Sequence, residues 1–279
     1  MKNFLDNNGR LTMIAGPCAL ESYKNSIEIA LTMKKIAEKL NIDYYFKVSI
    51  DKANRTNATH YRGIGFDKGL ETLSRIKNDS GLRVVTDIHE PWQAEKIANV
   101  VDIIQIPAFL CRQTDLLKAA AETKKIINVK KAQYMSPEEM GKVADKLVYF
   151  GNNKIILCER GNAFGYNNLI TDMTGLVRLK KHGYPIAFDA THSVQISGGG
   201  QNTSNSGASE FVPYLARAAI ATGVVDVLFM ETHNDPNNAL CDGSCMVKLS
   251  YMEELLTKCV QVYELCKGSN DVCTRTDFS

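Results

Sequence analysis

The chain has 279 residues, of which 44% are hydrophobic and 23% are charged, so it is long enough to bury a large core. Its 33 Lys and Arg residues nearly balance its 31 Asp and Glu residues, which gives a formal net charge of +2 at pH 7. This balance excludes the global basic field that is typical of nucleic-acid-binding proteins. Cationic side chains that serve a function are therefore expected to be gathered locally.

The start of the chain and its cysteines indicate a cytoplasmic protein. Residues 1–8 contain no apolar core of a signal peptide, and no run of the sequence approaches membrane-spanning length. The eight cysteines are therefore expected to be mostly reduced, and no membrane partner is expected. Cys241 and Cys245 have no second Cys or His pair in the sequence to complete a structural zinc site.

Short apolar runs recur along the chain, each with a polar or charged end. They are rich in Ile, Val and Phe and too short for helices, which predicts strands that are buried on both faces. Eight runs have this character: 11–15, 44–48, 83–88, 103–106, 126–129, 154–158, 185–188 and 227–230.

The segments between these runs carry helix signals. Ser136, Pro137 and Glu139 place a cap, a first-turn proline and an acidic residue at one helix start. Apolar residues at helical spacing over 70–77 predict another helix, which the polar segment 78–81 ends. Further starts are predicted at 90–93 and 114–117.

Eight alternations of strand and helix in a chain of this length predict one (β/α)8 TIM barrel over residues 1–279. A short extension at 1–10 precedes it. A doubly wound sheet is the alternative, although no glycine-rich dinucleotide fingerprint follows the first predicted strand.

The carboxyl ends of the predicted strands carry side chains that bind ligands. A barrel enzyme builds its site from these ends and from the loops that follow them. The opposite ends show far fewer such residues, so we predict that the carboxyl-end side chains converge on one mouth. In chain order they are Cys18, Lys47, Asp87 with His89, Gln105, Lys130 with Lys131, Arg160, Asp189 with His192, and Glu231 with His233.

Five cations at or near these ends are suited to bind phosphate or carboxylate groups: Lys47, Lys52, Arg55, Lys130 and Arg160. One alternative is that they form structural ion pairs with the nearby carboxylates Asp51, Asp87, Glu159 and Asp189. Another is that Lys47 forms a Schiff base, as in some aldolases.

A second group combines one thiol, one imidazole and two carboxylates: Cys18, His192, Glu231 and Asp242. Such a set suits a divalent cation such as Zn²⁺, Fe²⁺, Mn²⁺ or Co²⁺. The sequence spacing contains no metal motif. Cys18 is alternatively a small buried apolar residue, and His192 a hydrogen-bonded residue of the rim.

The glycine-rich segment 197–207 follows the seventh predicted strand. It is too polar to pack into a core, and long loops in compact chains are often functional. We predict a mobile loop over the mouth, with a plain connection as the alternative.

The motifs at the eight strand ends resemble those of the 3-deoxy-D-manno-octulosonate 8-phosphate synthase (2-dehydro-3-deoxyphosphooctonate aldolase) family, over about residues 11–248. They are found at 14–22, 46–56, 86–90, 105–115, 128–131, 158–161, 188–192 and 231–233. The resemblance implies an enzyme that condenses phosphoenolpyruvate with D-arabinose 5-phosphate and releases inorganic phosphate. Its product is the eight-carbon sugar acid phosphate used for lipopolysaccharide.

The resemblance also implies roles for individual residues. Phosphoenolpyruvate would be held by Lys52, Lys130 and Arg160, with help from Ser49, Gln105 and the backbone near Ala108. Lys47 and Asn54 would contact the sugar phosphate. Arg55 and Thr56 would reach its phosphate in a neighbouring subunit, which implies a homo-oligomer, usually a tetramer in this family. His192 and Asp87 would stand near the reacting atoms, with Lys47 and Cys18 beside them.

This family has a metal-dependent and a metal-independent branch. The independent branch has asparagine where this chain has Cys18. Cys18 with His192, Glu231 and Asp242 therefore resembles the metal-dependent branch, in which the ion orients the aldehyde or activates the attacking water.

Two rival functions remain. The related 3-deoxy-D-arabino-heptulosonate 7-phosphate synthases use erythrose 4-phosphate and typically have Lys-Pro-Arg-Thr where this chain has residues 52–55. Asn54 offers a donor and an acceptor to the hydroxyls of a longer sugar, which favours the eight-carbon product. The other rival is a non-catalytic barrel that senses sugar phosphates, which would not need the reactive group around Cys18 and His192.

Overall fold

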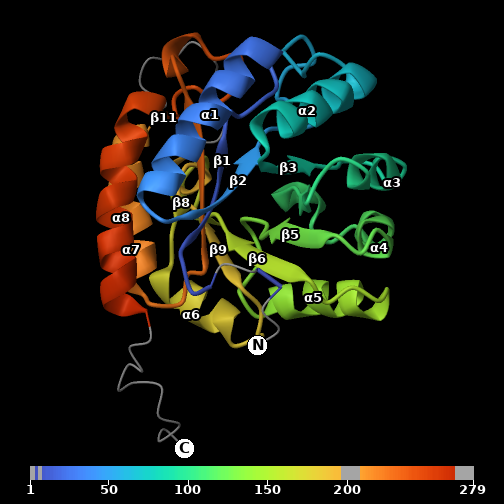
Figure 1. The fold of residues 1–279 in the computed structure, drawn as a ribbon. Helices are drawn as coiled ribbons and strands as arrows, with labels where there is room; N and C mark the ends of the chain where they lie inside the picture. Colours follow the sequence, from blue (N-terminus) through green and yellow to red (C-terminus); the bar gives the residue numbers. More distant parts are fainter. Residues whose placement is uncertain (1–3, 6–7, 196–207, 268–279) are drawn as a thin grey trace, which may run out of the picture.

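The structure is a computed structural model that describes residues 4–5, 8–195 and 208–267. Eight parallel strands form a closed barrel at its centre (Figure 1). The first of them pairs in parallel with the last, so the doubly wound alternative is wrong. In barrel order the strands are β1 Thr12–Gly16, β2 Asp43–Lys47, β3 Arg83–Asp87, β4 Ile103–Ile106, β5 Ile126–Lys130, β6 Ile155–Glu159, β9 Ile186–Asp189 and β10 Val227–His233.

Helices surround the barrel, and neighbouring helices along the chain lie side by side around it (Figure 1). The helices are α1 Tyr23–Lys39, α2 Phe66–Ser80, α3 Gln93–Ala98, α4 Thr114–Glu122, α5 Glu139–Tyr149, α6 Met173–Lys180, α7 Val212–Ala221 and α8 Met252–Cys266. The predicted (β/α)8 TIM barrel is therefore confirmed. Every helix in the described part of the chain is too short or too polar to cross a lipid bilayer.

Local signals in the sequence account for several helix ends. The Ser136 hydroxyl accepts from the Glu139 backbone N–H at 3.3 Å, and the Glu139 carboxylate accepts from the Ser136 N–H at 2.9 Å. This reciprocal pair satisfies two N–H groups at the start of α5. Gly81, with φ of 67°, ends α2 in the left-handed conformation that glycine adopts without strain.

The core has two layers. The larger layer lies between the strands and the surrounding helices. The smaller layer fills the barrel and is made by Leu5, Ile14, Tyr45, Val85, Ile103, Ile156, Cys158, Ala187, Val227 and Phe229. Leu5, which precedes the first strand, is 2% exposed and contributes to this inner layer. Part of the predicted 1–10 extension, residues 1–3 and 6–7, lies outside the described residues.

Three further strands of two residues each were not predicted. β7 Asn162–Ala163 and β8 Leu169–Ile170 form an antiparallel hairpin after β6. β11 Val247–Lys248 extends the carboxyl end of β10. Strands this short carry no readable hydrophobic period. The predicted loop 197–207 lies outside the described residues.

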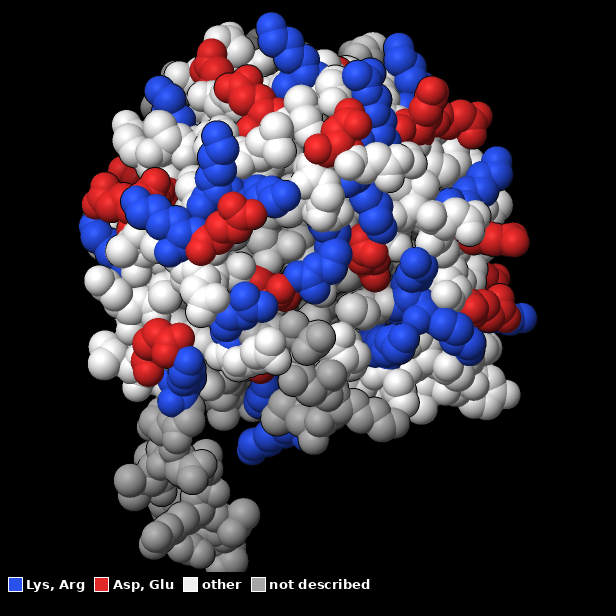
Figure 2. Space-filling view, viewed as in Figure 1, with Lys and Arg blue, Asp and Glu red and all other residues white. Residues whose placement is uncertain are grey.

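Surface charge does not form a single-sign field on the face shown in Figure 2. Lys and Arg side chains are interspersed there with Asp and Glu among the described residues. A mixed surface of this kind steers charged ligands weakly. The informative charges are those inside the barrel mouth.

Candidate active site

A cavity of about 1100 Å³ opens at the carboxyl ends of the barrel strands. Its wall includes nearly all of the residues that the sequence predicted for the site: Lys47, Ser49, Lys52, Asn54, Arg55, Thr56, Asp87, Gln105, Ala108, Lys130, Arg160, His192, Glu231 and Asp242. Four predicted residues do not line it: Lys131, Asp189, His233 and Cys18, whose sulfur lies 3.3 Å from a carboxylate oxygen of Asp242. The predicted convergence on one mouth is confirmed for the residues that line the cavity.

Strand alternation explains the convergence. Side chains two residues apart on a strand point to the same face. Tyr45 fills the barrel interior, and Lys47 therefore points into the mouth. The same relation joins inner-layer residues to mouth residues on four other strands: Val85 to Asp87, Ile103 to Gln105, Cys158 to Arg160, and Phe229 to Glu231.

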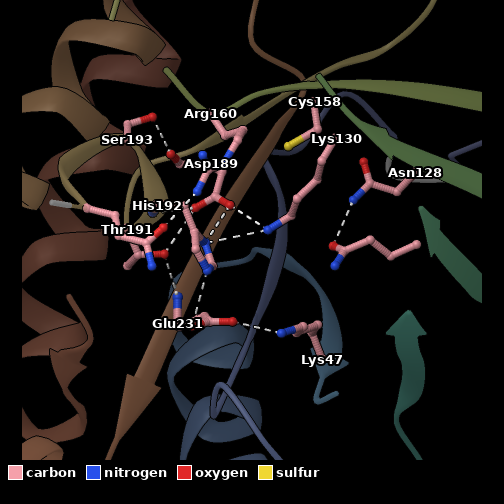
Figure 3. A network of polar contacts seen from close by, with 12 residues as sticks. Lys47, Asn128, Lys130, Cys158, Arg160, Asp189, Thr191, His192, Ser193 and Glu231 are labelled. Carbon is pink, nitrogen blue, oxygen red and sulfur yellow. Dashed lines mark hydrogen bonds and ion pairs between the residues drawn. The ribbon is translucent and has the colours of Figure 1, made fainter. Parts of the chain in front are cut away.

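Two buried ion pairs organise one side of the mouth (Figure 3). Lys47 Nζ lies 2.7 Å from Glu231 Oε1, and both side chains are 1% exposed. Lys130 Nζ lies 2.5 Å from Asp189 Oδ2, and that same oxygen lies 2.7 Å from His192 Nδ1. His192 Nε2 is 3.6 Å from Glu231 Oε2, so the imidazole bridges the two pairs.

The buried carboxylates of this network are held ionised. Burial alone raises the pKa of Asp189, but the charges of His192 and Lys130 hold it well below its usual range. Burial also raises the pKa of Glu231, but the charges of Lys47 and His192 lower it well below its usual range. The Asp189 carboxylate also accepts from the His192 backbone N–H at 2.9 Å. These contacts fix the orientation of the imidazole.

Lys52 and Arg160 differ from the paired lysines. In the described part of the chain, neither forms a salt bridge within 4.0 Å. Lys52 Nζ donates to Ser49 Oγ at 3.1 Å, and Arg160 Nη2 donates to Gln195 Oε1 at 2.9 Å. Arg160 Nη1 is buried and has no hydrogen-bond partner among the described residues. Burial lowers the pKa of Lys52, but the electrostatic influence of nearby acidic side chains, Cys18 first among them, raises it overall.

Asp87 is a third buried carboxylate of the mouth. Its Oδ2 lies 3.5 Å from His89 Nε2, while its Oδ1 has no hydrogen-bond partner among the described residues. Burial raises the pKa of Asp87, but the hydrogen bond and charge of His89 lower it far below its usual range. Gln105 accepts from Asn128 Nδ2 at 3.3 Å and lies on the next strand, opposite Asp87.

The predicted metal-binding side chains meet at Asp242. Donor atoms of His192, Glu231 and Asp242 lie within 4.8 Å of one another. Donor atoms of Cys18, Cys241 and Asp242 meet the same limit. A set of thiol, imidazole and carboxylate donors suits a borderline divalent ion, so the residues present fit such a group.

Arg55 turns into the mouth of its own chain in this structure. Its Nη1 donates to the sulfur of Cys241 at 2.8 Å and lies 3.9 Å from Asp242 Oδ1. Arg55 is half-buried and Thr56 is exposed, and both line the cavity together with Asn54. The predicted reach of Arg55 and Thr56 into a neighbouring subunit stays a prediction.

The ion-pair alternative holds for only part of the cation set. Lys130 pairs with Asp189, as that alternative expected. Two other carboxylates of that alternative pair with cations that do not belong to the mouth: Asp51 pairs with Arg62, and Glu159 pairs with Lys131.

Lys131 was predicted at the mouth, and this prediction is wrong. It follows the inward-pointing Lys130, so alternation turns it to the outer face of the barrel. There its Nζ is fully buried, 2.7 Å from Asn162 Oδ1 of the β7–β8 hairpin and 3.5 Å from Glu159 Oε1. Lys131 therefore fastens the hairpin to the barrel.

His233 was also predicted at the mouth, and it does not line the cavity. Its Nε2 lies 2.8 Å from Asn25 Nδ2 and 3.4 Å from Glu21 Oε2, which come from α1 and the segment before it. The end of β10 pairs with β11 beyond the barrel, so the regular inward alternation ends before this residue. His233 ties β10 to α1.

Sequence reasoning missed three contributors to the site. Phe229 lies beneath Lys130, whose Nζ is 3.8 Å from the ring centroid. Gln195 holds Arg160, and Cys241 lies 2.9 Å from Cys18. An aromatic residue two positions before Glu231 was a usable signal for Phe229. Gln195 and Cys241 come from loops, where no period places a side chain.

The fold and the cation-rich cavity define a class: a (β/α)8 barrel whose strand ends form a binding site for anionic small molecules. The chain belongs to the DAHP synthetase I family, which it matches over residues 4–267, within the group of the 2-dehydro-3-deoxyphosphooctonate aldolases. The resemblance inferred from the strand-end motifs is therefore confirmed.

Several curated proteins with that name are similar along nearly the whole chain. The protein of Cyanothece sp. is 51% identical over 250 residues, which are 90% of this chain and 91% of the relative. That of Desulfotalea psychrophila is 52% identical over 252 residues, 90% of this chain and 89% of the relative. That of Rickettsia bellii is 48% identical over 263 residues, 94% of this chain and 95% of the relative.

Proposed function

We propose that this protein condenses phosphoenolpyruvate with D-arabinose 5-phosphate and water to give 3-deoxy-D-manno-octulosonate 8-phosphate and inorganic phosphate. This reaction is an early step of lipopolysaccharide (Kdo) biosynthesis. The observation that carries the proposal is a buried mouth in which Lys52 and Arg160 form no salt bridge within the described chain. Two phosphates and a carboxylate supply the missing anions. The name shared by the curated relatives supports the same reaction.

Phosphoenolpyruvate is assigned to the half of the mouth with free donors. Arg160 offers Nη1, which has no partner in the described part of the chain, and its planar guanidinium suits a bidentate oxyanion. Lys52, positioned by Ser49 at 3.1 Å, supplies a second charge. Lys130 completes the cation cluster, and Gln105 with the backbone near Ala108 adds neutral contacts along the same wall.

The sugar phosphate is assigned to the segment after β2. Asn54 lines the cavity and presents an amide to sugar hydroxyls, and Arg55 and Thr56 are suited to its phosphate. The Lys47 ammonium is engaged by Glu231 at 2.7 Å, so we assign it a contact with the sugar rather than a Schiff base.

The chemistry joins C3 of phosphoenolpyruvate to the aldehyde carbon of the sugar. The electron pair of the enol double bond forms that C–C bond, and the aldehyde oxygen gains a proton. Water adds to C2 and gives up both of its protons, one to the former aldehyde oxygen and one to the departing phosphate, as the C2–O bond to phosphate breaks and a carbonyl forms at C2. His192, oriented by Asp189 at 2.7 Å, and Asp87, whose Oδ1 has no hydrogen-bond partner among the described residues, are placed to hold and move these protons.

A divalent ion (Zn²⁺, Fe²⁺, Mn²⁺ or Co²⁺) would be held by Cys18, His192, Glu231 and Asp242. When bound, it would polarise the aldehyde oxygen or the attacking water. The test strips the protein with a chelator, verifies metal removal and adds single ions back. Full activity of the stripped protein contradicts the metal requirement, and metal-free activity of Cys18→Asn supports it, because asparagine supplies no thiolate.

Self-association as a homotetramer in the cytoplasm is part of the proposal. Large aromatic side chains are exposed after three neighbouring strands at the mouth: Phe109 after β4, Tyr134 after β5, and Phe164 and Tyr166 in the hairpin after β6. Exposed apolar groups gathered on one face are typical of an interface. Light scattering on the purified protein measures the oligomer, and a monomer at assay concentration contradicts this part.

The decisive assay measures phosphate release with phosphoenolpyruvate and either sugar phosphate, before and after chelation. We expect turnover with arabinose 5-phosphate to exceed turnover with erythrose 4-phosphate. The reverse order favours a 3-deoxy-D-arabino-heptulosonate 7-phosphate synthase. No phosphate release with any added metal favours a non-catalytic sugar-phosphate-binding barrel. Arg55→Ala is expected to raise KM for the sugar phosphate far more than KM for phosphoenolpyruvate.

A further inference from the structure

Cys241 is a buried thiol for which the proposed reaction has no role. It is 1% exposed, and its sulfur lies 2.9 Å from the sulfur of Cys18. Both cysteines are free thiols. With Asp242 they form a group whose donor atoms all lie within 4.8 Å of one another. Two sulfurs and a carboxylate at this spacing are a donor set of the kind that binds Zn²⁺.

The turn at 241–243 is shaped to bring these side chains together. Asp242 has φ of 46°, a left-handed conformation that few residues other than glycine adopt. At Gly243 an added Cβ would lie 2.1 Å from the Pro236 carbonyl oxygen, so only glycine fits the close approach of the two backbones. Backbone strain of this kind persists where the surrounding structure holds it, often at ligand sites. The turn aims both Cys241 and Asp242 at Cys18.

Arg55 supplies an outer partner for the Cys241 sulfur. Its Nη1 donates to that sulfur at 2.8 Å and lies 3.9 Å from Asp242 Oδ1. Metal ligands are usually oriented by such hydrogen bonds from groups that do not touch the ion. Arg55 also lines the cavity, so it joins the sulfur group to the wall assigned to the sugar phosphate.

We propose that Cys241 provides a second sulfur ligand to the metal site. The ion is then held by two thiolates, with Asp242 shared between the Cys18 side and the side formed by His192 and Glu231. The inference rests on the metal site of the proposed function and adds a donor to it. Two sulfur donors favour Zn²⁺ over Mn²⁺, because thiolates select softer ions and carboxylates select harder ones.

The test is spectroscopic. The metal-free full-length protein is titrated with Co²⁺ under reducing, oxygen-free conditions, and the sulfur-to-cobalt charge-transfer absorption is measured per bound ion. We expect Cys241→Ser and Cys18→Ser each to retain about half of the wild-type intensity, because each removes one of two thiolate ligands. The matched control is Cys245→Ser, since Cys245 is buried in the same segment but lies outside the donor group. It is expected to retain the full band.

Affinity provides a second readout. Cys241→Ser should weaken Zn²⁺ binding roughly tenfold or more, whereas Mn²⁺ binding should change by no more than about twofold. The proposal would be overturned if Cys241→Ser kept both the cobalt band intensity and the Zn²⁺ affinity of the wild type. Equal losses for both ions would also overturn it, because they would indicate a damaged site rather than a lost sulfur ligand. Neither readout requires turnover, so a failed condensation assay is distinguishable from a failed ligand assignment.

Discussion

Ionised side chains at the two ends of the barrel differ in their burial and in their hydrogen-bond partners. At the amino ends of the strands, two carboxylates close hydrogen-bonded units, whereas a third, Asp43, pairs with Arg83 but keeps a buried Oδ2 without a partner among the described residues. Asp226 accepts from Lys180 Nζ at 2.5 Å and from the backbone N–H of Ile186, the first residue of β9, at 2.7 Å. Asp102 similarly accepts from Lys77 at 2.8 Å and from a β3 backbone N–H at 2.8 Å. Each of these two carboxylates joins a helix cation to the start of a strand.

Compared with Asp226 and Asp102, the ionised groups at the carboxyl ends are buried more deeply and satisfied less completely. Arg160 Nη1 and Asp87 Oδ1 have no hydrogen-bond partner among the described residues, and Lys52 forms no salt bridge there. An unpaired buried polar group costs free energy, so it persists where a ligand supplies the partner. The amino ends therefore stabilise the fold, and the carboxyl ends are shaped to bind anions. Variants at the two ends should separate stability from activity.

The largest effect is expected for Arg160→Ala. Loss of a buried guanidinium that pairs with an anionic substrate should lower kcat/KM for phosphoenolpyruvate roughly 10²–10³-fold. The thermal unfolding midpoint should change little, because the hydrogen-bond partner of Arg160 among the described residues is the neutral Gln195. Steady-state kinetics and thermal unfolding measure both quantities. Arg178→Ala is the control, since Arg178 pairs with Glu138 at the surface. Comparable activity loss in both variants would contradict the assignment.

Asp189→Asn should affect both activity and stability. His192 loses the carboxylate that orients it, so kcat should fall roughly 10²-fold. Lys130 is left buried without its counter-charge, which should lower the free energy of unfolding at pH 7 by roughly 3 kcal/mol. Unchanged kcat with lower stability would give the carboxylate a purely structural role.

The same variant makes a pH prediction. His192 and Lys130 outweigh burial and hold the pKa of Asp189 below its unfolded value of 3.8. A lowered folded pKa gives stability that is present above that value and lost as the pH falls through the folded pKa. The wild type should therefore lose stability more steeply below pH 3.8 than Asp189→Asn. Urea unfolding at a series of acidic pH values measures the two slopes.

This contrast also shows how far the sequence can predict the structure. The eight barrel strands were predictable because each is a short apolar run, buried on both faces. The mouth was predictable because parallel strands bring their carboxyl ends to one edge. Lys131 and His233 were misplaced because position at a strand end does not fix the face. Lys131 follows the inward Lys130, and His233 lies where β10 leaves the barrel for β11.

The remaining errors concern loops. Cys241 is 223 residues from Cys18 in the sequence, and only the turn at Asp242 and Gly243 brings their sulfurs together. Which carboxylate a mouth cation meets, such as Asp189 for Lys130, likewise depends on side-chain reach across the closed barrel. Periodicity gives the face and height of a side chain on its own strand, but it does not give its partner across the mouth.

At the amino ends, Asp226→Ala should lower stability without affecting catalysis. The variant leaves the Lys180 ammonium and the Ile186 N–H without their acceptor, so the free energy of unfolding should fall by roughly 1–3 kcal/mol. KM for both substrates should stay within about twofold, because the variant changes no contact with substrate in either the ground state or the transition state. Urea unfolding and steady-state kinetics test the two statements. A rise in either KM would show that the two ends are coupled.

Substitution of His233 is expected to change stability least. It tests whether a residue on a mouth strand stabilises the fold or helps to bind the substrates. His233 belongs to a mouth strand but binds Glu21 and Asn25 on the outer side, so it should behave like the amino-end pairs. Burial lowers its pKa, but the hydrogen bond and charge of Glu21 raise it overall above 6.5. A raised folded pKa gives stability that is fully present below pH 6.5 and lost as the pH rises through the folded value.

The urea midpoint of the wild type should therefore decline slightly from pH 6 to pH 9, because an unfolded histidine has a pKa of about 6.5. In His233→Gln the midpoint should depend less on pH over the same range. Glu21→Gln should flatten the curve in the same way, because it removes the charge that raises the pKa of His233. Both variants should keep the wild-type KM for phosphoenolpyruvate. If His233→Gln instead raised that KM and left the pH slope intact, the residue would act with the mouth, and strand position would determine its function more than its contacts.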